Sequence, residues 1–156
     1  MSLFSINSFN VRGLGDSRKR RAIFRWLSNT HRGISFLQET HGSNIVEQSW
    51  RKEYGNEIIF NHGTCNSRGV AILFPPKLNY IVNSITRDEN GRFLLVDTDI
   101  NGVNMVLINI YAPTKDNHKA QLEFLHFLQR TIADMFDRNL VIGGDFNTYF
   151  DVGKDK

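Results

Sequence analysis

Apolar and polar residues form short blocks along the chain, and the spacing of the apolar positions changes repeatedly between strand-like and helix-like. The strand-like blocks lie at residues 3–9, 34–38, 57–60, 69–74, 80–87, 93–100, 103–111 and 140–143. Asn101-Gly102 separates two of these blocks, which is typical of a two-residue hairpin turn. Asp88-Glu89-Asn90-Gly91 separates another pair and also favours a hairpin. We therefore expect an antiparallel central region.

Three segments have the three- and four-residue spacing of amphipathic helices, at residues 18–27, 44–53 and 119–138. Asp16 or Ser17 is placed to cap the first, and Ser43 the second. The predicted inward face of the first helix is formed by Ile23, Trp26 and Leu27. The predicted buried stripe of the third comprises Leu122, Leu125, Leu128, Ile132 and Met135. Strands and helices interleave, so we expect an α/β fold with helices packed on mixed sheets.

The length and composition indicate one ordinary folded domain. The chain has 156 residues, of which 40% are hydrophobic and 22% charged, and no linker or repeat divides it. Its apolar runs are too short to cross a bilayer, and no secretory signal opens the sequence. A single cysteine, Cys65, excludes an internal disulfide. We expect an intracellular protein, nuclear or cytoplasmic, with no membrane partner.

Positive charge is concentrated near the start of the chain. The formal net charge is +3, but residues 1–32 hold seven basic side chains and one acidic one, a local net charge of +6. A basic helix face of this kind attracts polyanions such as nucleic acid, although a solvated helix face explains it equally well.

Several predicted strands end abruptly in a polar side chain. Asn10, Glu39, Tyr111, Asp145 and Asn147 all follow apolar runs in this way. Each alone could be a turn former or a surface residue. If the strands are parallel, however, their carboxyl ends lie along one edge of the sheet, where ligands bind in layered α/β proteins.

This residue set suits one kind of chemistry. Carboxylates, carboxamides and a phenol are hard oxygen-rich groups, which favour Mg²⁺ over zinc because Mg²⁺ needs few carboxylates and completes its shell with water and phosphate oxygens. Glu39 could hold the metal, Asp145 polarise a water, Asn147 orient it and Tyr111 donate to a phosphoryl oxygen. The set therefore predicts metal-assisted hydrolysis of a phosphate ester.

Five segments, in order along the chain, resemble the endonuclease/exonuclease/phosphatase superfamily. They are Phe9-Asn10-Val11-Arg12-Gly13-Leu14, Leu37-Gln38-Glu39-Thr40-His41, Ser67-Arg68-Gly69-Val70-Ala71-Ile72-Leu73, Ile110-Tyr111-Ala112-Pro113-Thr114 and Gly144-Asp145-Phe146-Asn147. Within it the sequence is most similar to apurinic-type endonuclease domains of non-LTR (LINE-type) retrotransposons, relatives of exonuclease III.

The resemblance implies a four-layer α/β sandwich of two mixed sheets flanked by helices, of which residues 1–156 would form the N-terminal portion. It implies Mg²⁺, or Mn²⁺ in its place, held by Glu39 and Asn10. Tyr111 would contact the scissile phosphate, Asp145 would activate water and Asn147 would support both. Arg68 and Thr114 would bind substrate, which would be DNA. A reverse transcriptase domain would belong to the parent protein.

Two departures from the family pattern matter. Thr114 stands where relatives often carry an asparagine, but its hydroxyl can still donate a hydrogen bond. Relatives also continue to a Ser-Asp-His motif, whereas this chain ends at Lys156, and none of its five histidines lies in a matching motif. We therefore expect the C-terminal part of the domain to be missing, open strand edges where it would pack, and an isolated chain that is inactive or very weak.

Two other functions remain open at this stage. The same core residues would serve a superfamily phosphatase or a deadenylase. The basic N-terminal region and the loop at residues 61–68 would also suit a non-catalytic nucleic-acid-binding fragment, whose binding would depend steeply on salt.

Overall fold

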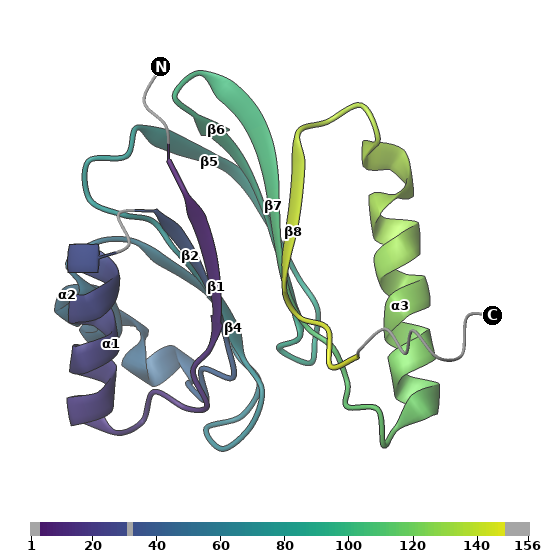
Figure 1. Ribbon diagram of the computed structural model, residues 1–156, viewed down its shortest axis with the longest axis horizontal. Helices are drawn as coiled ribbons and strands as arrows, with labels where there is room; N and C mark the ends of the chain where they lie inside the picture. The colour runs from purple at the N-terminus through teal and green to yellow at the C-terminus, as the bar shows by residue number, and fades with distance from the viewer. Residues whose placement is uncertain (1–3, 31–32, 149–156) are drawn as a thin grey trace.

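A computed structural model describes residues 4–30 and 33–148 and shows two four-stranded sheets packed face to face between helices (Figure 1). The first sheet has the order β1-β2-β4-β3 and the second the order β5-β6-β7-β8. The strands are β1 (Ile6–Asn10), β2 (Ile34–Gln38), β3 (Ile58–Asn61), β4 (Val70–Leu73), β5 (Tyr80–Arg87), β6 (Phe93–Ile100), β7 (Val103–Tyr111) and β8 (Leu140–Asp145).

The helices form the two outer layers. Helices α1 (Ser17–Thr30) and α2 (Glu47–Tyr54) cover the first sheet, and α3 (His118–Ile132) lies against the second (Figure 1). Short 3-10 segments, η1 (Asn44–Val46) and η2 (Ala133–Met135), precede α2 and follow α3. The fold is thus the expected four-layer α/β sandwich of two mixed sheets. No described helix is long and apolar enough to cross a membrane.

Most predicted strands are confirmed, and three of them match to the residue: 80–87, 93–100 and 103–111. Both predicted hairpins form, and the tighter one turns through Asn101 and Gly102 with φ of 53° and 82°. These left-handed values at both turn positions match the right-handed twist of the flanking strands. The turn residues therefore set the register of the central antiparallel strands.

The buried faces of two helices differ from the prediction. In α3 the buried residues are Gln121, Phe124 and Leu128, while Leu122 and Leu125 are 45% and 37% exposed. The other three residues of the predicted stripe do pack against the second sheet, together with Phe124 and Phe127; they are Leu128, Ile132 and Met135. In α1 the buried set is Arg20, Phe24 and Leu27, so the predicted inward position of Trp26, now 42% exposed, was wrong.

Of the two predicted helix caps, one is confirmed and the other is wrong. The Oδ1 atom of Asp16 accepts from the backbone amides of Arg18 and Lys19 at 2.8 and 2.9 Å, which confirms the first cap. Ser43 makes no side-chain capping bond, because the chain enters α2 through the 3-10 turn η1. The second cap was therefore wrong.

Three apolar layers hold the sandwich together. One lies between α1, α2 and the first sheet, one lies between the two sheets, and one lies between the second sheet and α3. The middle layer contains fully buried side chains from both sheets, such as Phe36, Ile72 and Leu94. This central layer fixes the distance between the two sheets, and therefore between groups at their shared edge.

A small polar network crosses the middle layer. Asn109 on β7 donates from Nδ2 to the backbone oxygens of Leu37 and Ala71 at 2.9 and 2.8 Å, and its Oδ1 accepts from Gln38 Nε2 at 2.8 Å. Asn109 is fully buried and Gln38 nearly so. Because the partners belong to opposite sheets, the network ties β7 to β2 and β4 just below the strand ends.

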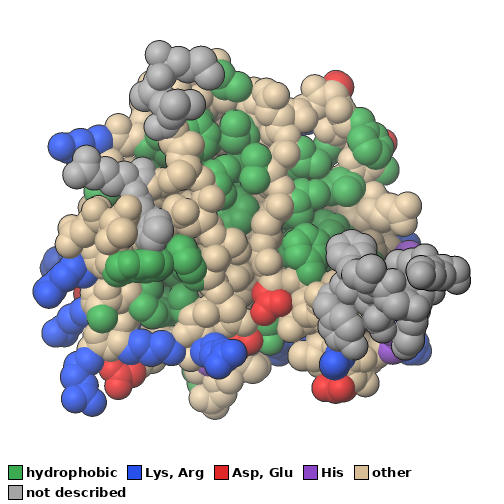
Figure 2. Space-filling model, in the orientation of Figure 1, with side chains coloured by type: hydrophobic (Ala, Val, Ile, Leu, Met, Phe, Trp, Pro, Cys, Tyr) green, Lys and Arg blue, Asp and Glu red, His purple; other side chains and the backbone are tan. Residues whose placement is uncertain are grey.

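One side of the sandwich is open. Among the described residues, β1 and β8 are edge strands of the two sheets and lie next to each other (Figure 1). Apolar side chains show through between the strands on this side (Figure 2), and every residue of β8 is partly exposed. The expectation of open strand edges is therefore met.

The buried carboxamide network predicts a large stability effect. Asn109→Ala removes three buried hydrogen bonds between the sheets and leaves a cavity in the middle layer, so we expect a loss of about 2–4 kcal/mol in the free energy of unfolding. Urea denaturation measures it. The matched control is Asn66→Ala in an exposed loop, which should change little. Equal stability of the two variants would contradict this account of the sheet contact.

Candidate functional site

The carboxyl ends of four strands meet at one edge of the sandwich. Strand β1 pairs parallel with β2, with Asn10 opposite Gln38, the residue before Glu39. Strand β7 pairs parallel with β8, with Tyr111 opposite Asp145. The two parallel pairs therefore deliver Asn10, Glu39, Tyr111 and Asp145 to the same edge, two from each sheet.

The Asn10 carboxamide joins the two carboxylates. Its Nδ2 donates to Glu39 Oε1 at 2.8 Å and to Asp145 Oδ2 at 2.9 Å. Its Oδ1 accepts from the backbone amide of Arg12 at 3.1 Å, which holds the side chain in place. Two residues separated by more than a hundred positions in the sequence are thus bridged by one side chain, and both carboxylates lie on the same face of the molecule.

Tyr111 completes the cluster as a hydrogen-bond donor. Burial raises the pKa of the Tyr111 phenol, and the hydrogen bond to the Glu39 carboxylate raises it further. A raised pKa keeps the hydroxyl protonated at neutral pH. The phenol can therefore donate to an oxygen atom placed between Tyr111 and the carboxylates.

Asn147 lies beside the cluster and holds the residues that the second sheet contributes to it. Its backbone amide donates to Asp145 Oδ1 at 3.0 Å, and its Nδ2 donates to the Ala112 carbonyl at 2.7 Å. Gln121 on α3 in turn donates to the Asn147 carbonyl at 3.1 Å. Asn147 therefore fixes both Asp145 and the segment that follows Tyr111.

Backbone strain gathers in the loops of this edge. Of the seven non-glycine residues with positive φ in the described part of the chain, five belong to these loops: Arg12, Glu39, His41, Arg68 and Asn147. Glu39 has φ of 55°, which an L-residue adopts only at a cost in free energy. At Gly144 a side chain would collide with the Ile110 backbone, so β8 can approach β7 closely only with glycine there.

The two predicted substrate-binding residues are placed differently. Arg68 is half-buried in the loop before β4, and its carbonyl accepts from the His41 amide at 3.1 Å. Thr114 is exposed, and its carbonyl accepts from the Asn117 amide at 3.0 Å. These backbone contacts tie Arg68 to the loop that contains Glu39 and Thr114 to the start of α3.

Arg92 was missed by the sequence analysis. Its Nη1 donates to the Tyr111 carbonyl at 3.1 Å, its guanidinium lies 5.1 Å from the centroid of the Tyr111 ring, and its own carbonyl accepts from the Tyr111 amide at 2.8 Å. The register of the predicted hairpin could have identified it. Phe93 pairs with Ile110, and one further step along both strands places Arg92 opposite Tyr111.

The cluster fits a hard divalent cation by its donor set. Glu39 and Asp145 supply two carboxylates, and Asn10 supplies an amide oxygen with one lone pair still free after its bond to the Arg12 amide. Mg²⁺ is usually held by one or two carboxylates, water and substrate phosphate. Within residues 4–30 and 33–148, no three His, Cys, Asp or Glu side chains gather as a metal cage.

Two histidines lie near this edge. His41 Nε2 is 3.5 Å from Glu39 Oε2, on the side away from Asn10's contact with Oε1. His62 is stacked on Phe60 with ring centroids 5.1 Å apart, and its Nε2 is 2.9 Å from Glu47 Oε1. His62 therefore packs against the first sheet and α2, whereas His41 contacts the candidate site.

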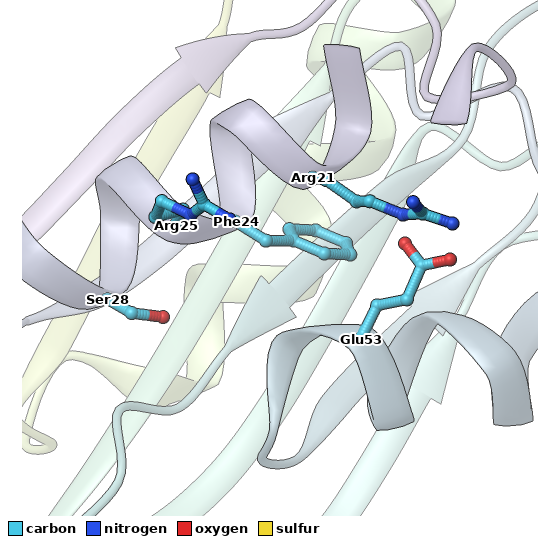
Figure 3. Close-up of a pocket in the computed structure, with 5 residues that line it drawn as sticks. All are labelled: Arg21, Phe24, Arg25, Ser28 and Glu53. Atoms are coloured by element: carbon cyan, nitrogen blue, oxygen red, sulfur yellow. The ribbon is translucent and has the colours of Figure 1, made fainter. Parts of the chain in front are cut away.

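Basic side chains cover the surface over α1 and extend toward the carboxylates. In Figure 2 they gather at the left and lower left, over α1, and reach the acidic atoms near the lower centre. A hollow on α1 is lined by Arg21, Phe24, Arg25, Ser28 and, across from them on α2, Glu53 (Figure 3). Glu53 is already paired with Arg20 at 2.8 Å, so this hollow carries mixed charge and none of the clustered strand-end residues.

The fold and the cluster together define a class: four-layer α/β sandwiches with carboxylates and carboxamides at the strand ends. The family model described as the endonuclease/exonuclease/phosphatase family matches residues 7–151. The chain belongs to this family.

Individual relatives agree with this assignment. The chain is 35% identical over 148 residues to the Transposon TX1 uncharacterized 149 kDa protein of Xenopus laevis, covering 94% of this chain and 11% of that protein.

Solved structures share the fold. An AP endonuclease from Archaeoglobus fulgidus matches with a TM-score of 0.67 at 23% identity, over 94% of this chain and 58% of that one. D. rerio TDP2 complexed with a single-strand DNA product matches with a TM-score of 0.69 at 18% identity, over 94% and 62%. Truncated TDP2 from Caenorhabditis elegans matches over 91% of this chain and 61% of its own, with a TM-score of 0.69 and 18% identity. The chain thus spans about three fifths of these structures.

The environment of His62 predicts a pH-dependent stability. Burial lowers the pKa of His62, outweighing the opposite effect of Glu47, and its Nδ1 is buried without a hydrogen-bond partner. The unfolded chain therefore binds a proton near the ordinary pKa of 6.5 while the folded chain stays neutral. The free energy of unfolding should fall as pH drops below about 6.5.

Urea unfolding at several pH values between about 5 and 7 measures this slope. His62→Gln should reduce it, whereas His126→Gln, at an exposed position on α3, should keep the slope of the unchanged chain. A His62→Gln variant with an unchanged slope would assign the pH dependence to other groups.

Proposed function

We propose that this chain carries the metal-binding and water-activating part of a Mg²⁺-dependent phosphodiesterase that acts on DNA. The observation that carries the proposal is the Asn10 bridge, which holds the Glu39 and Asp145 carboxylates together at one edge. Tyr111 adds a protonated phenol to the same cluster. Two carboxylates beside a hydrogen-bond donor suit a phosphate group that must be both bound and attacked.

Glu39 and Asn10 are the residues that would hold Mg²⁺. When bound, the ion neutralises charge on the phosphate oxygens as a Lewis acid. Asn10 keeps Glu39 oriented through its 2.8 Å bond, and the remaining carboxylate oxygen of Glu39 faces His41 at 3.5 Å. One carboxylate, one amide and water are sufficient for this metal.

Asp145 is the proposed base. Its Oδ1 accepts from the Asn147 amide and its Oδ2 from Asn10, so the carboxylate is fixed in orientation while its remaining lone pairs stay open. It would take a proton from the attacking water. Tyr111 would donate its hydroxyl proton in a hydrogen bond to a non-bridging phosphoryl oxygen, where negative charge develops.

DNA is the proposed substrate because the charges and the relatives agree. The basic side chains over α1 would bind a phosphate backbone (Figure 2), and the structural neighbours include an AP endonuclease and a protein bound to a single-strand DNA product. The relationship to a transposon protein supports a retrotransposon-type parent, in which a reverse transcriptase domain would accompany this one.

The chain alone is proposed to be a poor catalyst. Among the described residues, no histidine contacts Asp145 or Asn147, and the 156-residue sequence contains no Ser-Asp-His segment. A positioned acid or base typically contributes roughly 10²–10⁴ in rate. We therefore propose that residues 1–156 form the N-terminal portion of the catalytic domain.

Metal binding and cleavage test the proposal together. Mg²⁺ should shift the side-chain amide NMR signal of Asn10, and Glu39→Gln should abolish the shift because the main carboxylate ligand is lost. Nicking of supercoiled plasmid should be slow, should require Mg²⁺, and should fall by roughly 10² or more in Asp145→Asn.

The matched control is Asp134→Asn, which changes an exposed carboxylate in η2 and should leave both readouts unchanged. An Asn10 signal indifferent to Mg²⁺ would overturn the metal assignment. Rapid nicking would overturn the proposed incompleteness, and DNA binding that needs no Mg²⁺ and brings no cleavage would favour a purely binding role.

A further inference from the structure

A cavity of about 270 Å³ lies next to the candidate site, between the β5–β6 turn and α3. Its walls include Asp88 and Arg92 from the turn, Pro113 from the segment after Tyr111, and Glu123, Phe124 and Phe127 from α3. Arg92 and Pro113 each touch or closely follow Tyr111, so the cavity begins where the candidate phosphate site ends.

The cavity has flat apolar walls that are held in place. Phe124 and Phe127 lie with ring centroids 6.3 Å apart, and Phe127 packs edge-on against buried Phe93 at 5.1 Å. Phe124 is 8% exposed, and Pro113 is buried. Rigid aromatic surfaces beside a small cavity suit one planar ring system, because stacking on such surfaces does not depend on the identity of the base.

Arg92 brings positive charge to the mouth of this cavity. Among the described residues it forms no ion pair with a carboxylate, and the nearby Arg68 guanidinium repels it. The Asp88 carboxylate attracts Arg92 but forms no ion pair with it: its Oδ1 accepts from Asn61 and from the backbone amides of Arg92 and Phe93, and its Oδ2 accepts from the Asn90 amide. A guanidinium at the mouth of the cavity that is not paired with a carboxylate can bind a phosphate.

We propose that this cavity is a nucleotide subsite, in which one nucleobase stacks against Phe124 and Phe127 and its phosphate binds Arg92. The proposal rests on the proposed function, because the nucleotide would adjoin the scissile phosphate at Tyr111. Asp88 and Glu123 also line the cavity, so its interior suits the uncharged base better than a phosphate, and the phosphate is assigned to Arg92.

Filling the cavity tests the proposal without changing any residue of the candidate site. Ala120 lines the cavity on α3, and Ala120→Leu adds volume there while keeping a strong helix former. The probe is deoxyadenosine 5′-monophosphate without Mg²⁺, followed by NMR shifts of the Phe127 ring. Ala120→Leu should weaken its binding at least roughly tenfold, the scale of one lost stacking contact.

Three controls distinguish binding of the base from binding of the phosphate and from a general effect of the substitution. Ala22→Leu makes the same change at an exposed position of α1 and should bind the nucleotide like the unchanged chain. Deoxyribose 5-phosphate should shift Arg92 signals but not Phe127. Arg92→Met should weaken the binding of both probes, because it removes the phosphate contact and leaves the cavity.

The outcomes separate this proposal from the proposed function. Equal nucleotide affinity in Ala120→Leu and Ala22→Leu, or equal affinity for the nucleotide and the sugar phosphate, would overturn the subsite. Nucleotide binding that needs no Mg²⁺ and is weakened by Ala120→Leu would support the subsite. If Glu39→Gln then left cleavage unchanged, that result would overturn the proposed function and not the subsite.

Discussion

The candidate site depends on one carboxamide between two carboxylates. Glu39 and Asp145 belong to different sheets and would repel each other, but Asn10 offers each of them an N–H within 2.9 Å. This contact requires the sheets to keep a fixed separation, which the apolar layer between them and the Asn109 network below the strand ends provide. The packing of the core therefore determines the geometry of the candidate site.

Sequence reasoning located the strand-end residues because the backbone leaves little choice. Apolar runs that end at or just before Asn10, Glu39 and Asp145 identify strands and where they end, and parallel pairing then brings the ends together. Asn101-Gly102 fixed the antiparallel register equally well. The same register also places Arg92 opposite Tyr111, so that residue could have been found by continuing the count.

Side-chain burial was less accessible to prediction, because it depends on which of two possible faces meets a partner. Leu122 and Leu125 have suitable helical spacing, yet the aromatic stripe containing Phe124 fills the space against the second sheet better. Trp26 packs edge-on with Phe9 of β1, with ring centroids 5.0 Å apart, and keeps 42% of its surface exposed. Local spacing cannot show such competition between tertiary contacts.

At Glu39 the positive φ lowers the stability of the fold, while the side chain supplies a carboxylate to the candidate site. A glycine there would adopt the φ of 55° without strain, whereas glutamate adopts it at a cost in conformational free energy. Selection for a more heat-resistant protein would therefore favour losing the carboxylate, and selection for the proposed metal-binding role would favour keeping it. A lineage released from the second demand should lose Glu39 early, and its descendants would retain the sandwich with an altered edge.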